Sequence, residues 1–212
     1  MRKKSNVERQ ADKAAGDDAA RERIVSQSRR QFMAHGFRGV TMDDLAADLG
    51  MSKKTLYAHF TSKTALLEAV IGNKVAAVNS DLERSIAESP SNFSASLHRA
   101  LACMRQHSEE LQPPFLRDVA RETPQLFQLV QTKRRAVLQR HFGKLLGEGR
   151  KAGMIRKDIS ATLAIEILIT CADAIINPQK LAELNLPAKT CLSAILTIFL
   201  EGMITDEGRG NL

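Results

Sequence analysis

The sequence predicts an all-α protein, and its composition supplies two of the reasons. Hydrophobic residues make up 43% of the 212 residues, which is enough to build a sizeable core. Aromatic residues make up only 4%, with eight Phe, one Tyr and no Trp, whereas all-β folds depend on aromatic and β-branched side chains. The third reason is the helical spacing of the apolar residues. The net charge of +7 is a weak indication of a polyanionic partner.

Helical periodicity and helix-end signals divide the chain into nine expected helices. Residues 1–18 are charged and small, so we expect a disordered basic arm there, with Arg2, Lys3 and Lys4 near its start. Beyond the arm, Gly, Pro and N-capping Ser or Thr mark the helix ends. The expected helices cover about residues 20–36, 42–49, 53–60, 63–89, 93–112, 115–120, 124–150, 160–177 and 188–204.

Residues 41–60, with the sequence TMDDLAADLGMSKKTLYAHF, have the spacing of a helix-turn-helix motif. Ala46 is small where two helices would cross, and Gly50, four residues later, supplies the turn. Leu56, ten residues after Ala46, is the inward anchor of the second helix. The pattern predicts two short helices that share one core.

The outer face of the second helix carries groups that suit DNA. At 100° per residue, Leu56 and Phe60 point inward. The opposite face and its flanks carry two lysines, a threonine, a small alanine, a tyrosine and a histidine: Lys53, Lys54, Thr55, Ala58, Tyr57 and His59. Lysine can donate to guanine O6 and N7, a small residue lets a helix enter the groove closely, and a tyrosine hydroxyl can reach a phosphate oxygen. Taken singly, each residue is also explained by a solvated helix face.

Two helix starts next to this face offer further contacts to phosphate. Lys63 lies in the first turn after the Ser62 cap, where the helix dipole disfavours a cation. An anion docked there would remove the conflict, because the backbone N–H groups and Lys63 would share one phosphate. Thr41 has capping-box spacing with Asp44 and is similarly placed at the start of the preceding helix.

Residues from about Ile24 to Ile71 resemble the N-terminal DNA-binding domain of the TetR family of bacterial transcriptional regulators. The resemblance rests on the end of the first helix, the helix-turn-helix motif and the start of the fourth helix: Phe32, Gly36-Phe37, Val40-Thr41-Met42, Leu45-Ala46, Leu49-Gly50-Met51-Ser52, Thr55-Leu56-Tyr57, His59-Phe60 and Ser62-Lys63. It implies a three-helix helix-turn-helix DNA-binding domain over residues 19–66. A six-helix ligand-binding and dimerisation domain would follow over residues 67–212.

The resemblance also implies roles for single residues and for the whole protein. Phosphate contacts would come from Thr41, Tyr57 and Lys63. Base edges or the adjoining backbone would be met by Lys53, Lys54, Thr55 and His59, although many family members have Gly or Pro where this chain has Lys54. The protein would be a regulator, most often a repressor, that binds a palindromic operator in double-stranded DNA as a homodimer and is released by a small-molecule inducer. The alternatives are a regulator that needs no ligand or is controlled by a protein, and a helical lipid-binding protein or enzyme.

The expected C-terminal domain has two helices that are apolar on more than one face, at about residues 160–177 and 188–204. One buried stripe satisfies a monomer, so the second face predicts a partner in a two-fold four-helix bundle; complete burial within one protomer is the alternative. Apolar residues on the preceding helices are expected either to line an inducer pocket or to be ordinary core. These are Leu97, Leu101, Met104, Phe115, Phe127 and Val130.

The sequence gives no support to enzymatic chemistry, a metal site or a cofactor. It contains no GxSxG, HExxH, GxxxxGK[ST] or GxGxxG motif. The three cysteines are odd in number and form no CxxC, which argues against a zinc site or a disulfide framework and fits a reducing cytosol. The N-terminus lacks an apolar signal sequence, and the apolar run 191–204 is too short for a membrane span. We therefore expect a cytoplasmic protein that is not an enzyme.

Overall fold

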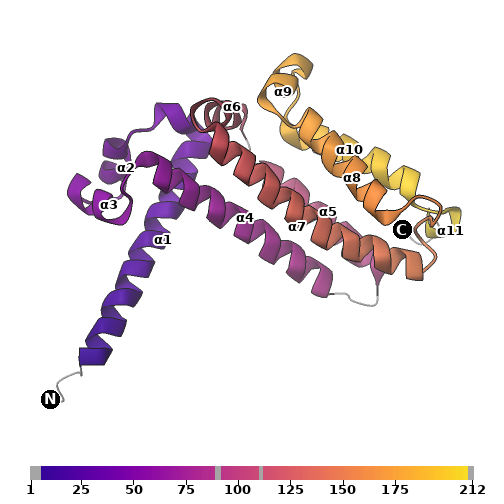
Figure 1. Ribbon diagram of the computed structural model, residues 1–212, viewed down its shortest axis with the longest axis horizontal. Helices are drawn as coiled ribbons and strands as arrows, with labels where there is room; N and C mark the ends of the chain where they lie inside the picture. The colour runs from indigo at the N-terminus through magenta and orange to yellow at the C-terminus, as the bar shows by residue number, and fades with distance from the viewer. Residues whose placement is uncertain (1–5, 89–91, 110–111, 210–212) are drawn as a thin grey trace. The chain divides into compact units, whose positions relative to one another are not determined.

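The computed structural model describes residues 6–88, 92–109 and 112–209, and within these it contains helices and no strand. The chain divides into two compact units, residues 1–73 and 74–212. This division falls inside α4 (Lys63–Ala87), as does the boundary at residues 66 and 67 that we expected from the sequence. The prediction of an all-α fold is confirmed (Figure 1).

The N-terminal unit consists of α1 (Asn6–Gly39), α2 (Met42–Asp48), α3 (Lys53–His59) and the first turns of α4. As predicted, the first helix is interrupted at Gly36, whose φ of 78° and ψ of 160° are not helical. The core is formed by side chains that are at most 2% exposed, and every one of these helices contributes to it: Ile24, Phe32, Leu45, Leu56, Phe60, Leu66, Leu67 and Val70.

The prediction of a disordered arm is wrong for residues 6–18, which are helical and form the N-terminal part of α1. Their sequence is rich in Ala, Arg, Lys, Glu and Gln, which are strong helix formers. Extending an existing helix also avoids the unfavourable nucleation step. Residues 1–5, including Arg2, Lys3 and Lys4, lie outside the described residues.

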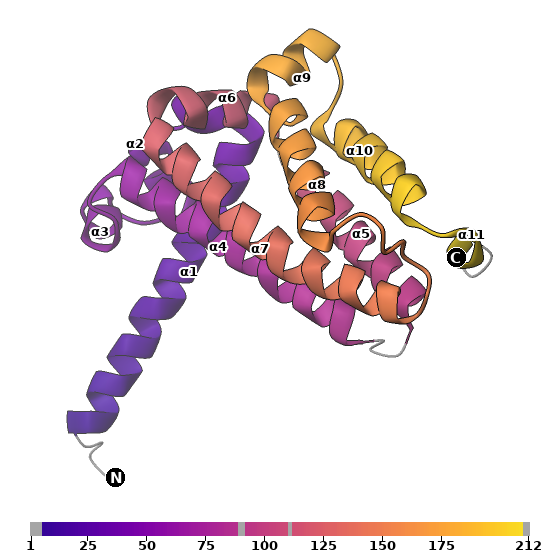
Figure 2. The same cartoon turned by 45° about the vertical axis from the view of Figure 1, so that its right-hand side comes forward.

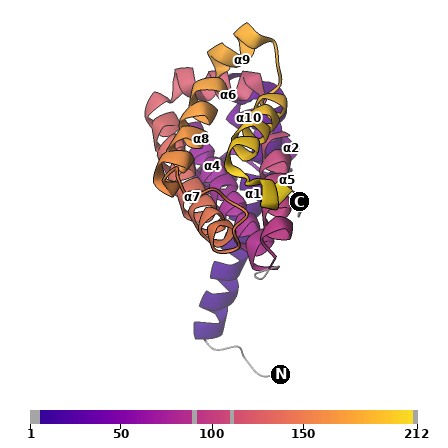
Figure 3. The same cartoon turned by 90° about the vertical axis from the view of Figure 1, so that its right-hand side faces the viewer.

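The C-terminal unit contains the rest of α4 and seven further helices among its described residues. In chain order these are α5 (Phe93–Glu109), α6 (Pro113–Glu122), α7 (Pro124–Lys151), α8 (Ala161–Ile175), α9 (Pro178–Leu184), α10 (Ala188–Met203) and the single turn α11 (Asp206–Arg209). Helix α7 packs against α5, α6 and α8, while α10 packs against α5 and α8 and α6 packs against α9 (Figure 2). One side of the unit is formed by α7 and α8, and the other by α10 and α5 (Figure 3).

The expected set of six C-terminal helices omits α9 and α11. We interpreted Asn177-Pro178 as a helix stop. In the structure Asn177 is also the N-cap of α9, where its side chain accepts from the Lys180 N–H at 2.9 Å, and Pro178 occupies the first turn. One signal therefore ends α8 and begins α9.

A short backbone clasp joins the loop after α7 to the segment after α10. The Arg156 N–H donates to the Met203 carbonyl and the Thr205 N–H donates to the Met154 carbonyl, both at 3.0 Å. Ile155 and Ile204 lie opposite each other in an isolated antiparallel bridge.

Within the described ranges no single helix is both long and apolar enough to cross a membrane. Helices α8 and α9 reach that length and apolarity only when they are combined as a bent pair.

Candidate nucleic-acid interface

Thr41 begins α2 with the predicted capping box, and this fixes where its polar groups point. The Asp44 N–H donates to the Thr41 hydroxyl oxygen at 3.1 Å, and the Thr41 N–H donates back to the Asp44 carboxylate at 2.9 Å. The Thr41 hydroxyl also donates to that carboxylate at 2.7 Å. These hydrogen bonds, led by the one from the side chain of Thr41, hold the pKa of Asp44 below its usual value. Thr41 is exposed, but its hydroxyl hydrogen is already used.

The turn between α2 and α3 has the predicted geometry. Gly50 has a φ of +63°, the left-handed conformation that favours glycine, and its N–H donates to the Ala47 carbonyl at 3.0 Å. The small Ala46 is 5% exposed and the anchor Leu56 is fully buried. Ser52 caps α3 by accepting from the Thr55 N–H at 3.0 Å. The spacing that predicted the motif therefore reflects its packing.

The outward face of α3 exposes Lys53, Lys54, Thr55 and Tyr57, as the helical wheel predicts. Tyr57, the only tyrosine in the chain, has 42% of its surface exposed. The Lys53 ammonium lies 2.7 Å from the Asp43 carboxylate of α2, and this hydrogen-bonded partner raises the pKa of Lys53. The Thr55 hydroxyl lies 2.8 Å from that of Ser52. An ammonium has three donors, so Lys53 can keep Asp43 and still donate to a base.

His59 does not lie beside this outward face as we expected. Its side chain is only 13% exposed, and its Nδ1 atom is 3.3 Å from the carboxylate of Asp17 on α1. His59 is three residues after Leu56, which is 60° away on the helical wheel and therefore nearer the inward side. The helical extension of α1, which the sequence did not predict, provides the surface that receives the ring.

Lys63 starts α4 behind the Ser62 cap, whose hydroxyl accepts from the Ala65 N–H at 3.0 Å. Its ammonium lies 4.4 Å from the centroid of the Phe37 ring, and its charge contributes to the lowered pKa of Asp44. These two neighbours offset the unfavourable position of a cation at a helix N-terminus. A bound anion is therefore not needed to explain why Lys63 lies there.

The three acidic residues of α2 all have partners within the N-terminal unit. Asp43 pairs with Lys53, and Asp44 forms the capping box. Asp48 accepts hydrogen bonds from Gln27 and Gln31 of α1. The carboxylates nearest the outward face of α3 are thus engaged in local contacts.

Two arginines of α1 hold the C-terminal ends of α2 and α3. The Arg21 guanidinium donates to the His59 carbonyl at 2.9 Å, and the Arg23 guanidinium donates to the Leu49 carbonyl at 3.2 Å. Arg21 also lies over the Phe60 ring, 4.2 Å from its centroid. Sequence reasoning missed both, because the partners are 38 and 26 residues apart and no local pattern connects them.

The six residues expected to line a ligand pocket are distributed over three helices of the C-terminal unit. Leu97 and Leu101 are buried in its main core cluster, and Met104 packs against that cluster half-buried. Phe115 on α6 is 4% exposed, and Phe127 and Val130 on α7 are half-buried. The three residues of α5 therefore lie together at the main core cluster. Phe115, Phe127 and Val130 are not among the described residues of that cluster.

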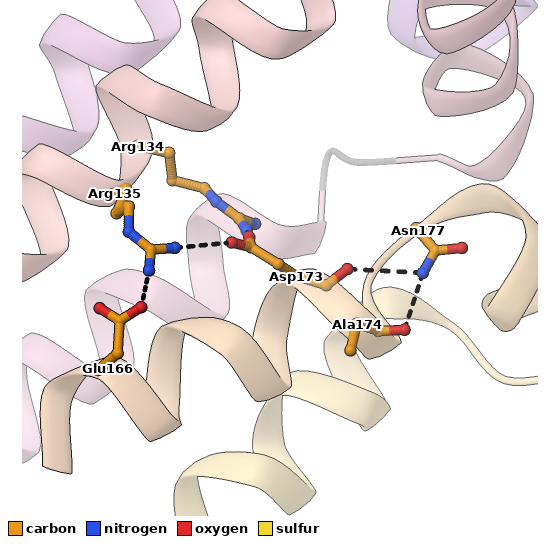
Figure 4. A network of polar contacts seen from close by, with 6 residues as sticks. All are labelled: Arg134, Arg135, Glu166, Asp173, Ala174 and Asn177. Atoms are coloured by element: carbon orange, nitrogen blue, oxygen red, sulfur yellow. Dashed lines mark hydrogen bonds and ion pairs between the residues drawn. The ribbon is translucent and has the colours of Figure 1, made fainter. Parts of the chain in front are cut away.

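A charged network joins α7 to α8 (Figure 4). Arg134 pairs with Asp173, and Arg135 pairs with Glu166 and, at 3.5 Å, with Asp173. Burial, reinforced by the charge of Arg135, lowers the pKa of Arg134 to about 10. Lys133, Arg134 and Arg135 form a basic run in the sequence, but the two arginines pair with carboxylates of α8 and are not simply solvated. Among the residues that the structure describes, no group of three or more His, Cys, Asp or Glu side chains could hold a metal ion.

Helix α3 is capped by Ser52, follows a tight turn at Gly50 and turns its polar side chains outward. This arrangement is that of the helix-turn-helix class of proteins. The model for "Bacterial regulatory proteins, tetR family" matches residues 24–70, which include α2, α3, all of α1 downstream of Arg23 and the first turns of α4. The helix-turn-helix region of the chain therefore matches the DNA-binding domain of this family.

Curated relatives extend the similarity to most of the chain. It is 28% identical over 189 residues to the uncharacterized HTH-type transcriptional regulator YvaF of Bacillus subtilis, which covers 87% of this chain and 96% of YvaF. It is 25% identical over 190 residues to the HTH-type transcriptional repressor DhaR of Mycobacterium sp. strain GP1, covering 87% and 92%. SmeT, the repressor of the Stenotrophomonas maltophilia multidrug efflux pump SmeDEF, shares the fold, with a TM-score of 0.63 at 19% identity over 88% of this chain and 91% of SmeT.

Proposed function

We propose that this protein is a transcriptional repressor that binds a palindromic DNA operator as a homodimer and is released by a small molecule. The observation that carries the proposal is the outward face of α3. It presents Lys53, Lys54, Thr55 and Tyr57 to solvent while Leu56 fixes the other side of the helix in the core. The family match over residues 24–70 and the similarity to the repressor DhaR support the same function.

In this proposal α3 enters the major groove, and Lys53 and Lys54 donate to guanine or to nearby phosphates. Thr55 lies against base edges. The phosphate contacts come from Tyr57, Lys63 and Thr41, whose hydroxyl hydrogen turns from Asp44 to a phosphate oxygen. We leave His59 out of the contact set, because its ring lies against Asp17.

The dimer is supported by apolar side chains that a single copy leaves exposed on the two helices singled out by the sequence. Leu163 and Ile167, one turn apart on α8, are 53% and 48% exposed, and Ile198 on α10 is 73% exposed. Packing α8 and α10 of two copies into a four-helix bundle would cover all three. We expect Ile198→Asp to give monomers in sedimentation velocity. Leu129→Asp, which changes an equally apolar α7 side chain that is 49% exposed, should leave the dimer intact.

For the ligand, we propose a lipophilic molecule bound among the helices of the C-terminal unit, with Leu97, Leu101 and Met104 as lining residues and Phe115, Phe127 and Val130 as further candidates. The support is their apolar chemistry and a neighbour of the same fold, the SmeT–triclosan complex, with a TM-score of 0.65 at 19% identity. A thermal-shift screen of lipophilic compounds tests this, because a ligand at 100 times its Kd stabilises the folded state by about 2.7 kcal/mol. A regulator without a ligand would show no shift in such a screen.

The DNA-binding proposal is tested by selecting bound sequences from a random duplex library. We expect a palindrome whose half-sites lie roughly 34–36 Å apart, and an affinity that falls steeply with salt. Selection of sequences without two-fold symmetry, or no selection at all, would refute the proposal.

Variants of the contact residues separate base reading from phosphate binding. Lys53→Ala should relax the selected motif at one position per half-site, whereas Asp43→Asn, which removes only the partner of Lys53, should preserve the motif. Tyr57→Phe and Lys63→Ala should weaken binding equally for all sequences. For Lys63→Ala, the slope of log affinity against log salt should also become shallower by about 0.9 per half-site. An unchanged motif in Lys53→Ala would show that Lys53 does not read bases.

A further inference from the structure

The C-terminal end of α3 is held by side chains from a different helix. An α-helix leaves its last carbonyl groups without partners inside the helix, and α3 is only seven residues long. The His59 carbonyl accepts instead from Arg21 of α1 at 2.9 Å. The same guanidinium covers the Phe60 ring at 4.2 Å, and Asp17, one turn earlier on α1, lies 3.3 Å from the His59 ring.

Electrostatics favour this arrangement. The C-terminal end of a helix carries partial negative charge, so a guanidinium placed there is attracted to the exposed carbonyls. Its hydrogen bond to His59 is charge-assisted, which makes it about twice as strong as one between neutral groups. Arg23 makes the corresponding contact to the Leu49 carbonyl at the end of α2. The two arginines thus connect α1 to both helices of the motif.

We propose that Arg21 is a positioning residue for DNA recognition: it fixes the C-terminal end of α3 before DNA binds and touches no DNA itself. This inference rests on the proposed function of α3. Every side chain or loop that a complex must order reduces its affinity, so a recognition helix that is already fixed loses less on binding. Without Arg21, the last turn of α3 frays in the free protein and must be ordered again on the operator.

The test compares Arg21→Gln with Arg21→Lys and with the control Arg30→Gln. Arg30 lies on the same helix, is exposed, and has Gln27 of α1 itself as its hydrogen-bond partner, so its change removes the same charge without loosening α3. Operator affinity is measured over a range of salt concentrations. Hydrogen exchange at the amides of residues 58–60 is measured on the free protein.

We expect Arg21→Gln to bind the operator about tenfold more weakly, the scale of one lost charge-assisted hydrogen bond, with an unchanged salt slope. Exchange at residues 58–60 should be faster, Arg21→Lys should recover part of both losses, and Arg30→Gln should exchange like the wild type at these amides. Wild-type affinity in Arg21→Gln would overturn the inference.

A salt slope lowered by about 0.9 per half-site in Arg21→Gln would also overturn it, because that result places Arg21 on a phosphate. If the wild-type protein selects no operator, the proposed function fails instead. The exchange measurement on the free protein still decides whether Arg21 holds α3.

Discussion

Gly149 on α7 is a helical position where one added methyl group should be destabilising. A Cβ atom there would lie 2.6 Å from Cγ1 of Ile155 and 2.6 and 2.7 Å from two ring carbons of Phe93. Ile155 and Phe93 are 1% and 7% exposed, so neither can move into solvent. Two residues earlier on the same helix, Gly147 has no neighbouring atom within 4 Å of such a Cβ, which makes it a matched control.

The two Gly→Ala changes should therefore shift stability in opposite directions. Gly147→Ala gains about 0.5–1 kcal/mol, because Ala is the better helix former. Gly149→Ala gains the same amount but loses roughly 2–3 kcal/mol to overpacking, because three atoms would lie within 2.7 Å of its Cβ, which leaves it about 1–2.5 kcal/mol less stable than the wild type. For a chain of this size the melting temperature should fall by about 2–10 °C for Gly149→Ala and rise for Gly147→Ala. Equal melting temperatures for the two variants would refute the packing argument.

Two further predictions concern polar groups in the C-terminal unit. Burial lowers the pKa of His141 below its ordinary 6.5, so the unfolded chain binds the proton more tightly and the free energy of unfolding should fall as the pH drops below about 6.5. His141→Gln, which keeps a donor for Asn79, should flatten that dependence in urea titrations between pH 5 and 7. In the α7–α8 network, Asp173→Asn should cost about 2 kcal/mol and Glu166→Gln less than about 1 kcal/mol, because Asp173 serves two arginines and is less exposed. Equal losses in chemical denaturation would contradict that ranking.

The sequence predicted the helix-turn-helix motif because its signals are local. Ala46, Gly50 and Leu56 each satisfy a packing or backbone requirement within 20 residues, and the structure buries or bends them as expected. The outward exposure of Lys53 and Tyr57 follows from the same helical period.

What the sequence missed depends on contacts between segments far apart in the chain. His59 lies against Asp17 because α1 extends into the segment predicted to be a disordered arm, and Arg21 donates to a carbonyl 38 residues away. Arg134 pairs with Asp173, which lies 39 residues away, and a local run of basic residues does not indicate such a distant partner. Helix α9 was missed for a different reason, since its cap and the end of α8 share Asn177.

The backbone clasp between the loop after α7 and the segment after α10 bears on how the protein can be tagged or trimmed. Thr205 contributes its N–H to the Met154 carbonyl and its hydroxyl to the Gly153 carbonyl at 2.9 Å, so the chain is tied down two residues beyond the end of α10. An affinity tag attached after residue 209 leaves these bonds intact. Trimming the chain back to Met203 removes both donors of Thr205 and opens the last turns of α10 to proteases.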